Sequence, residues 1–375
     1  MRVLHTSDWH LGRTFHRESL LGAQAAFIDH VLETVRAERV DVVVVSGDLY
    51  DRALPPVDAV ALCDEALRRL VAAGVRVMII SGNHDSATRL GFGTDLLGAA
   101  GVHLRTDPER AWRPVTIDGV SFYGIPYLEP ELVRGPWELP ERSHTAALGH
   151  AMARIREDAA GRGTRTVVLA HAFVTGGQAS DSERDISVGG VAHVPVSVFD
   201  GIDYVALGHL HGAQRMTETV RYSGSPIAYS FSEAGQVKGS WLVDIGPDGF
   251  AGAEFVPAPV PRPIARLRGR LDHLLTDPGY ARFEDHWLHI TLTDPLRPKA
   301  AMERLRQRFP HTLALAFEPE GAEAPARRTR ATAGRPDIEV ALDFVRDVRG
   351  EPADEDERRL LEQALAACRI KEATT

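Results

Sequence analysis

Histidine and carboxylate residues recur at the ends of short apolar runs in the first 211 residues. In chain order the motifs are Asp8-x-His10, Gly47-Asp48-x-x-Asp51, Gly82-Asn83-His84-Asp85, His171 and Gly208-His209-x-His211. Residues two apart on an extended segment point the same way, so Asp8 and His10 can share one metal ion, and His209 and His211 can face one site together. Carboxylate, imidazole and amide groups suit divalent ions such as Mn²⁺, Fe²⁺ or Zn²⁺. The pattern therefore predicts a catalytic metal centre.

The number of candidate ligands indicates two ions. The seven are Asp8, His10, Asp48, Asn83, His171, His209 and His211. Seven ligands are too many for one open catalytic ion, but they suit two ions about 3.5–4 Å apart that share a carboxylate. Asp48 is the natural bridge, because it follows the central valine run Val42–Val45. Cys63 and Cys368 form no CxxC pair, so a thiolate zinc site is not predicted.

The apolar runs that precede the motifs have the character of buried strands. Runs of four or five residues rich in β-branched types, such as Val42–Val45, are typical of such strands, and residues 58–73 between two runs show helical spacing. This alternation predicts an α/β domain of layered sheets, in which ligands gather beyond the carboxyl ends of the strands. We expect Gly47, Gly82 and Gly208 to let the backbone turn sharply and approach the ions.

The chain changes character after residue 258. Alternating prolines indicate a stiff connector, and residues 264–318 alternate between strand and helix patterns, with 286–292 and 312–317 as the clearest strands. An aperiodic stretch and two amphipathic helix patterns follow. We therefore predict four parts: an α/β domain over 1–258, a small α+β domain over 259–320, a linker over 321–336 and a helical docking tail over 337–375.

The five motifs, in this order and at these spacings, resemble those of the calcineurin-like metallophosphoesterases, whose fold is a layered αββα sandwich. The resemblance implies two ligand sets that share one carboxylate. One ion would be held by Asp8, His10, Asp48 and His211, and the other by Asp48, Asn83, His171 and His209.

The resemblance also assigns roles around the ions. His84 follows a ligand and is expected to point toward the substrate, where it would stabilise the phosphorane or protonate the leaving oxygen. Asp85 is placed with it in the catalytic set, as a residue that orients its neighbours. Arg52 could meet a substrate phosphate, and Asp51 is interpreted as structural. The other eleven of the 16 histidines match no motif and are interpreted as ordinary surface or core imidazoles.

Four further stretches are similar to those of one branch, the SbcD family of bacterial nuclease subunits. They are Pro55-Pro56, Ser180–Arg184 with Val188-Gly189-Gly190, Tyr222–Pro226 and Phe231–Gly239. The likeness is close over residues 1–245. Beyond residue 245 only the pattern of predicted strands and helices is similar. It implies Mn²⁺-dependent hydrolysis of DNA phosphodiesters, as a 3′→5′ exonuclease on duplex ends and an endonuclease on single strands and hairpins. It also implies a cytoplasmic, nucleoid-associated homodimer, bound through its C-terminal helices to an SbcC-type coiled-coil ATPase.

Two other functions remain open from the residues. A metallophosphodiesterase or phosphatase for small or protein substrates would use the same metals, although it has no need of a helical docking tail. A non-catalytic scaffold for DNA ends would show missing ligands, and every ligand position is filled.

The net charge of −9 at first argues against a nucleic-acid partner. The charge is unevenly distributed, since residues 259–335 hold 14 Lys and Arg against 9 Asp and Glu. We therefore expect DNA contact there, with weak binding by the isolated subunit. The start of the chain has no basic-then-apolar pattern, and no apolar run reaches the roughly 18 residues of a membrane span, so we expect neither a secretory leader nor a membrane partner.

Overall fold

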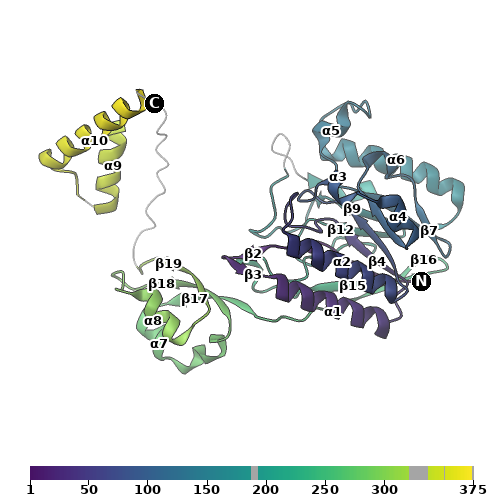
Figure 1. Ribbon diagram of the computed structural model, residues 1–375, viewed down its shortest axis with the longest axis horizontal. Coiled ribbons are helices and arrows are strands. Elements are labelled where there is room, and N and C mark those ends of the chain that lie inside the picture. The colour runs from purple at the N-terminus through teal and green to yellow at the C-terminus, as the bar shows by residue number, and fades with distance from the viewer. Residues whose placement is uncertain (187–192, 321–336, 350, 374–375) are drawn as a thin grey trace. The chain divides into compact units, whose positions relative to one another are not determined.

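The computed structural model describes residues 1–186, 193–320, 337–349 and 351–373 (Figure 1). The chain divides into two compact units, Met1–Glu318 and Pro319–Thr375. The predicted linker 321–336 and the Val188-Gly189-Gly190 stretch lie outside the described residues.

The first sheet of unit one carries the N-terminal motifs. Its strand order in the described residues is β16-β15-β1-β4-β5-β6, with β1, β4, β5 and β6 parallel. The strands span Arg2–Thr6 (β1), Val42–Ser46 (β4), Arg76–Ile80 (β5), Val102–Arg105 (β6), Gly239–Gly246 (β15) and Gly249–Pro257 (β16). Helices α1 (Leu21–Ala37) and α2 (Val57–Ala72) cover its outer face, where Phe27 and Cys63 share a core with Val43.

The second sheet carries the remaining motifs. Its order in the described residues is β13-β14-β12-β9-β8-β7, and β8, β9, β12 and β14 run parallel. The strands span Val115–Ile117 (β7), Val120–Ile125 (β8), Arg165–His171 (β9), Tyr204–Gly208 (β12), Gln214–Arg215 (β13) and Val220–Tyr222 (β14). Helices α5 (Pro130–Arg134) and α6 (His144–Arg162) cover its outer face, and Met152 packs with Val168 there.

The inner faces of the two sheets form a core of their own. Val42 and Val44 of β4 pack with Leu169 of β9 between the sheets, whereas Val43 and Val45 face the outer helices. Burial on both faces explains why β4 is an unbroken apolar run. Helices outside and two sheets inside make the predicted αββα sandwich, which is confirmed. We call this part the two-sheet domain.

A smaller sheet follows within the same unit. Strands β17 (Ile264–Gly269), β18 (Trp287–Leu292) and β19 (Thr312–Phe317) are parallel and lie in that order, with helices α7 (Leu271–Thr276) and α8 (Ala301–Arg308) against them. Trp287 packs against an aromatic cluster of the two-sheet domain around Phe15 and Phe231. Its strands and helices alternate as predicted for residues 264–318, and its all-parallel strand order makes it a small α/β unit. We call it the three-stranded domain.

Helices α9 (Asp337–Arg349) and α10 (Glu355–Ala373) make up the described part of the second unit and contact each other. Phe344, Val348 and Leu360 are exposed on them. These helices confirm the predicted C-terminal elements, whereas docking to a partner and the four domain boundaries stay predictions.

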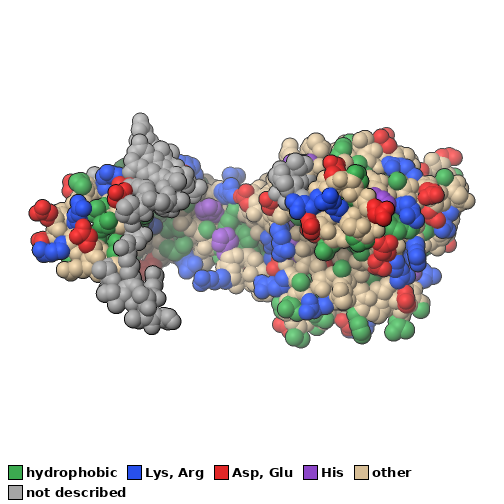
Figure 2. Space-filling model, turned by 90° about the horizontal axis from the view of Figure 1, so that it is seen from above, with side chains coloured by type: hydrophobic (Ala, Val, Ile, Leu, Met, Phe, Trp, Pro, Cys, Tyr) green, Lys and Arg blue, Asp and Glu red, His purple; other side chains and the backbone are tan. Residues whose placement is uncertain are grey.

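The remaining short strands and α-helices of the described residues are β2 (Thr14–Phe15), β3 (Glu18–Ser19), α3 (Ala87–Leu90), α4 (Thr94–Ala99), β10 (Phe173–Val174) and β11 (His193–Val194). Four 3₁₀ helices accompany them: η1 (Pro108–Arg110), η2 (Val196–Phe199), η3 (Phe231–Glu233) and η4 (Pro278–Phe283). Figure 2 shows basic and acidic side chains interspersed over the visible face of the two-sheet domain. Within the described ranges, we find no helix with the length and apolar character that spanning a bilayer requires.

Candidate metal centre

All seven predicted ligands lie at or just beyond the carboxyl ends of five parallel strands. Asp8 and His10 follow β1, Asp48 follows β4, Asn83 follows β5, His171 ends β9, and His209 and His211 follow β12. The strands come from both sheets, so the site lies where the two sheet edges meet. The sheet topology thus brings together residues up to 203 positions apart in the sequence.

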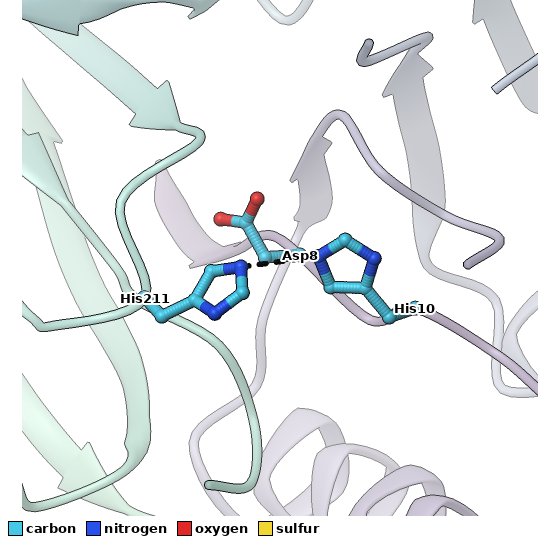
Figure 3. A group of neighbouring side chains, drawn as sticks. All are labelled: Asp8, His10 and His211. Carbon is cyan, nitrogen blue, oxygen red and sulfur yellow. Dashed lines mark hydrogen bonds between the residues drawn. The ribbon is translucent and has the colours of Figure 1, made fainter. Parts of the chain in front are cut away.

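The first group of ligands is Asp8, His10 and His211, whose ligand atoms all lie within 4.8 Å of one another (Figure 3). The Nε2 atoms of His10 and His211 are 3.1 Å apart. The Asp8 carboxylate accepts the backbone N–H of His209 at 3.0 Å, which ties the β1 loop to the β12 loop. All three side chains are buried.

The second group gathers around Asn83. Its Oδ1 lies 2.9 Å from Nε2 of His171 and 3.2 Å from Nδ1 of His209. Asp48 stands between the groups, because its Oδ2 is 3.5 Å from His171 Nε2 and 3.6 Å from His10 Nε2. This is the position that a bridging carboxylate must occupy.

These distances fit the coordination of divalent ions. Atoms bound at right angles to one ion, each about 2.1 Å from it, are about 3 Å apart. The buried Nδ1 of His10 and Nδ2 of Asn83 have no hydrogen-bond partner among the described residues. Nδ2 of Asn83 is an N–H donor, so it would suit an oxygen acceptor such as a metal-bound water, whereas Nε2 of His10 is the ring atom that faces the other ligands.

The electrostatics of the site follow from burial and close charges. Burial opposes ionisation of Asp48, yet His171, His10 and His84 lower the pKa of its carboxyl well below the usual range. Asp48 in turn raises the pKa of His171 to about 9 against the effect of burial. Burial raises the pKa of Asp8 to about 6 and lowers that of His209 well below its ordinary value. Binding of divalent cations here would require His171 to release its proton and both aspartates to be ionised.

The backbone at the ligands is strained. Asp8, His10, Asp48 and His209 have φ values of 53°, 43°, 49° and 102°, a region that side-chain-bearing residues seldom adopt. Such conformations persist where the surrounding structure imposes them, and they cluster at functional sites. Here backbone hydrogen bonds between the loops hold them, including Asp8 N–H to Gly47 C=O at 3.0 Å and His10 N–H to Asp48 C=O at 2.9 Å.

Two of the predicted glycines are required by close approach of the chain. A Cβ on Gly208 would lie 1.9 Å from the carbonyl oxygen of Ser46, and one on Gly82 would lie 2.1 Å from Oδ1 of Asp48. The strand ends therefore meet only because these positions lack a side chain.

The predicted catalytic residues take different positions. Nδ1 of His84 is 2.7 Å from the Asp51 carbonyl, and its Nε2 is 4.0 Å from Oδ2 of Asp48, so the ring lies at the edge of the ligand groups. Both oxygens of Asp85 accept backbone N–H groups, from Leu49, Tyr50 and Gly82 at 2.9–3.1 Å. Asp85 thus ties the β4 loop to the β5 loop. Burial, followed by repulsion from Asp48, raises the pKa of Asp85 to about 7.

The two arginines near the site differ in how they reach it. Arg52 is 63% exposed, with its Nε 3.8 Å from Oδ2 of Asp51. Arg184 was not predicted as a site residue, yet its Nη1 donates to the Asn83 carbonyl at 3.2 Å and its Nη2 lies 3.4 Å from Nδ1 of His84. The sequence offered a signal, because Arg184 ends the Ser180–Arg184 stretch used for the resemblance.

Comparison with protein families agrees with the fold and the site. The family model described as calcineurin-like phosphoesterase matches residues 1–213, so the chain belongs to the calcineurin-like phosphoesterase family. This family binds two divalent metals, and the described ligand groups are suited to that. A second model, for the SbcD C-terminal domain, described as type 5 capsule protein repressor C-terminal domain, matches residues 260–349. The two matches confirm the resemblance to SbcD-type nuclease subunits.

Solved structures similar to this chain include other metallophosphoesterases. A dimetal phosphatase from Danio rerio is 15% identical, with a TM-score of 0.40, over 69% of this chain and 99% of that chain. An archaeal phosphodiesterase is 12% identical, with a TM-score of 0.33, over 68% and 100%. The calcineurin-like phosphoesterase YfkN from Bacillus subtilis is 13% identical, with a TM-score of 0.35, over 68% and 89%. The family assignment rests on the family models.

The Gly208→Ala variant tests the close approach of the strand ends. We expect it to lower the free energy of unfolding by about 1–3 kcal/mol, since the added methyl group overlaps Ser46. We also expect weaker Mn²⁺ binding, because the ends of β4 and β12 must separate. Denaturant unfolding and calorimetric metal titration measure the two effects.

Gly149→Ala is the matched control. Gly149 lies inside α6, with nothing within 4 Å of an added Cβ, so this variant should be up to about 1 kcal/mol more stable and bind metal unchanged. Equal behaviour of the two variants would contradict the account of the strand ends.

Proposed function

We propose that this protein is the nuclease subunit of a DNA end-processing complex, a two-metal enzyme that hydrolyses DNA phosphodiesters. The observation that carries the proposal is a complete set of seven ligands around a bridging Asp48, in a chain that also matches the SbcD C-terminal domain. The proposed activities are 3′→5′ exonuclease on duplex ends and endonuclease on single strands and hairpins.

The proposed ligand sets follow the measured proximities. Asp8, His10, Asp48 and His211 would hold one ion, and Asp48, Asn83, His171 and His209 the other. Two divalent ions, for which we propose Mn²⁺, would supply a nucleophilic water and neutralise the phosphate oxygens. The carboxylates and neutral imidazoles of this chain keep those positions fixed and largely shielded from solvent.

His84 is the proposed catalytic residue. The Asp51 carbonyl accepts a hydrogen bond from Nδ1 of His84, which orients the ring and leaves Nε2 for the substrate. In the imidazolium form, with both ring nitrogens protonated, Nε2 can donate a proton to the leaving oxygen or stabilise charge on the phosphorane. Asp85 acts indirectly, because its carboxylate accepts hydrogen bonds from the backbone of the loops that carry Asp48 and Asn83 and so fixes these loops.

The proposed partners follow from the part of the chain after residue 258. The exposed apolar residues of α9 and α10 would dock on an SbcC-type coiled-coil ATPase, and the three-stranded domain would cap the active site and contact DNA. Two copies would form a homodimer within a heterotetramer, in the cytoplasm at the nucleoid. The net charge of −9 supports weak DNA binding by this subunit alone.

A Mn²⁺-dependent assay on duplex, single-stranded and hairpin DNA, with and without the ATPase, tests the proposal. We expect DNA cleavage by the wild type and a loss of about 10²–10⁴-fold in His84→Gln, with metal binding and folding unchanged. Asp48→Ala should abolish activity together with metal binding.

Three outcomes would contradict this account. Hydrolysis of nitrophenyl esters or nucleotides without any DNA cleavage would favour a small-molecule or protein phosphoesterase. Tight DNA binding without hydrolysis would favour a scaffold. Wild-type rates in His84→Gln would remove that residue from the mechanism.

Arg184 and Arg52 are competing candidates for the substrate phosphate. We propose Arg184 as the main contact, because its guanidinium reaches Asn83 and His84. Arg184→Gln should raise KM for DNA about 10- to 100-fold, as expected for losing a hydrogen bond to a charged group. Arg52→Gln should change KM less than threefold, since Arg52 is 63% exposed. Steady-state kinetics with both variants decide the matter, and a larger effect of Arg52→Gln would reverse the assignment.

A further inference from the structure

The ligand His211 is held by hydrogen bonds on its ring and on both backbone groups. Its Nδ1 lies 2.6 Å from the hydroxyl oxygen of Ser182. Its backbone N–H donates to Oε1 of Glu183 at 2.8 Å, and its carbonyl accepts from Nζ of Lys238 at 2.7 Å. The contacts come from two segments, residues 180–184 and 233–238, which the ligand motifs do not include.

The second of these segments contains a buried ion pair. Glu233 and Lys238 are 1% and 5% exposed, and Nζ of Lys238 donates to Oε2 of Glu233. Lys238 also has Ser225 at 3.0 Å and Gln236 at 2.8 Å as acceptors, so with Glu233 and the His211 carbonyl four acceptors share its three protons. A buried charge pair costs desolvation energy and often adds no net stability to the fold. A role of this pair is therefore to be sought in its contacts with the metal ligand His211.

Proton accounting fixes the tautomer of His211. The second oxygen of Glu233, Oε1, accepts a hydrogen bond from the Ser182 hydroxyl. An ionised carboxylate can only accept, so the single hydroxyl proton of Ser182 is used there. Toward His211, Ser182 can then only accept, which requires the proton to be on Nδ1. The lone pair is therefore on Nε2, the atom that faces Nε2 of His10 at 3.1 Å.

We propose that Ser182 and Glu233 are positioning residues that hold His211 in the Nδ1–H tautomer, with Nε2 directed at the ion it shares with His10. The inference rests on the proposed metal centre, but it does not depend on DNA being the substrate. Partners on the far ring nitrogen of a ligating histidine raise its basicity and orient it, and losing them typically costs 10–100-fold in metal affinity.

Ser182→Ala tests the proposal in the full-length protein. It removes the acceptor for Nδ1–H and leaves the ion pair of Glu233 with Lys238 in place. Calorimetric titration with MnCl₂ should show one of two sites weakened about 10- to 100-fold, and the other unchanged. Ser182→Thr retains the hydroxyl and should restore the affinity.

Ser121→Ala is the control for loss of a buried hydroxyl. Ser121 is fully buried in β8, where its hydroxyl lies 2.8 Å from that of Thr164. This variant should lose stability as Ser182→Ala does, with both manganese affinities unchanged.

The tautomer can be read directly by long-range ¹H–¹⁵N correlation spectra of the metal-free protein labelled at histidine. The proposal predicts the Nδ1–H pattern for His211 in the wild type and a mixture of tautomers in Ser182→Ala. The proposal is overturned by an Nε2–H pattern in the wild type, or by unchanged manganese affinity in Ser182→Ala. Failure of DNA cleavage with these metal results intact would instead count against the nuclease proposal.

Discussion

The structure depends on one buried carboxylate, that of Asp48, placed between imidazoles from both sheets. Its Oδ2 lies 3.5 Å from His171 of one sheet and 3.6 Å from His10 of the other, at 2% exposure. An ionised group so placed is costly unless it is paired. The imidazoles pair it in part, and two bridged divalent ions would pair it fully.

The rest of the fold supplies the rigidity that this arrangement needs. Three apolar cores, one between the sheets and one beneath each helical layer, fix the strands whose ends carry the ligands. Strained backbone at Asp8, His10, Asp48 and His209 is tolerated because hydrogen bonds between the loops impose it. The packing of the strands thus fixes the positions of the ligands, and the hydrogen-bonded loops fix the orientation of their side chains.

Much of the fold and of the metal centre could be predicted from the sequence, because the strands, the helices and the ligand motifs leave local patterns that recur along the chain. The β-branched runs and the helix expected over 58–73 correspond to buried strands and to α2 (Val57–Ala72), since burial on both faces leaves a clear pattern. The ligands were predicted because each follows a strand. The pairing of β1 with β15 could not be predicted, because it joins Arg2 to Asp244 through packing that no short pattern encodes.

The residues that sequence reasoning missed act across long separations. Arg184 reaches His84 over 100 positions, and Ser182 and Glu233 are 51 positions apart. Ser182 and Arg184 belong to the polar stretch Ser180–Arg184, which is visible in the sequence. Its role could not be predicted, because the sequence does not show that this stretch lies against His211, which follows β12. Asp85 was placed in the catalytic set, and the structure adds that its carboxylate binds loop backbone.

The central claim is that Asp48 bridges two metal ions. Anomalous diffraction from crystals soaked in MnCl₂ tests it directly. The account predicts two manganese peaks about 3.5–4 Å apart, both in contact with Asp48, one beside His10 and His211 and the other beside Asn83 and His171. A single peak, or two peaks that do not share Asp48, would contradict it.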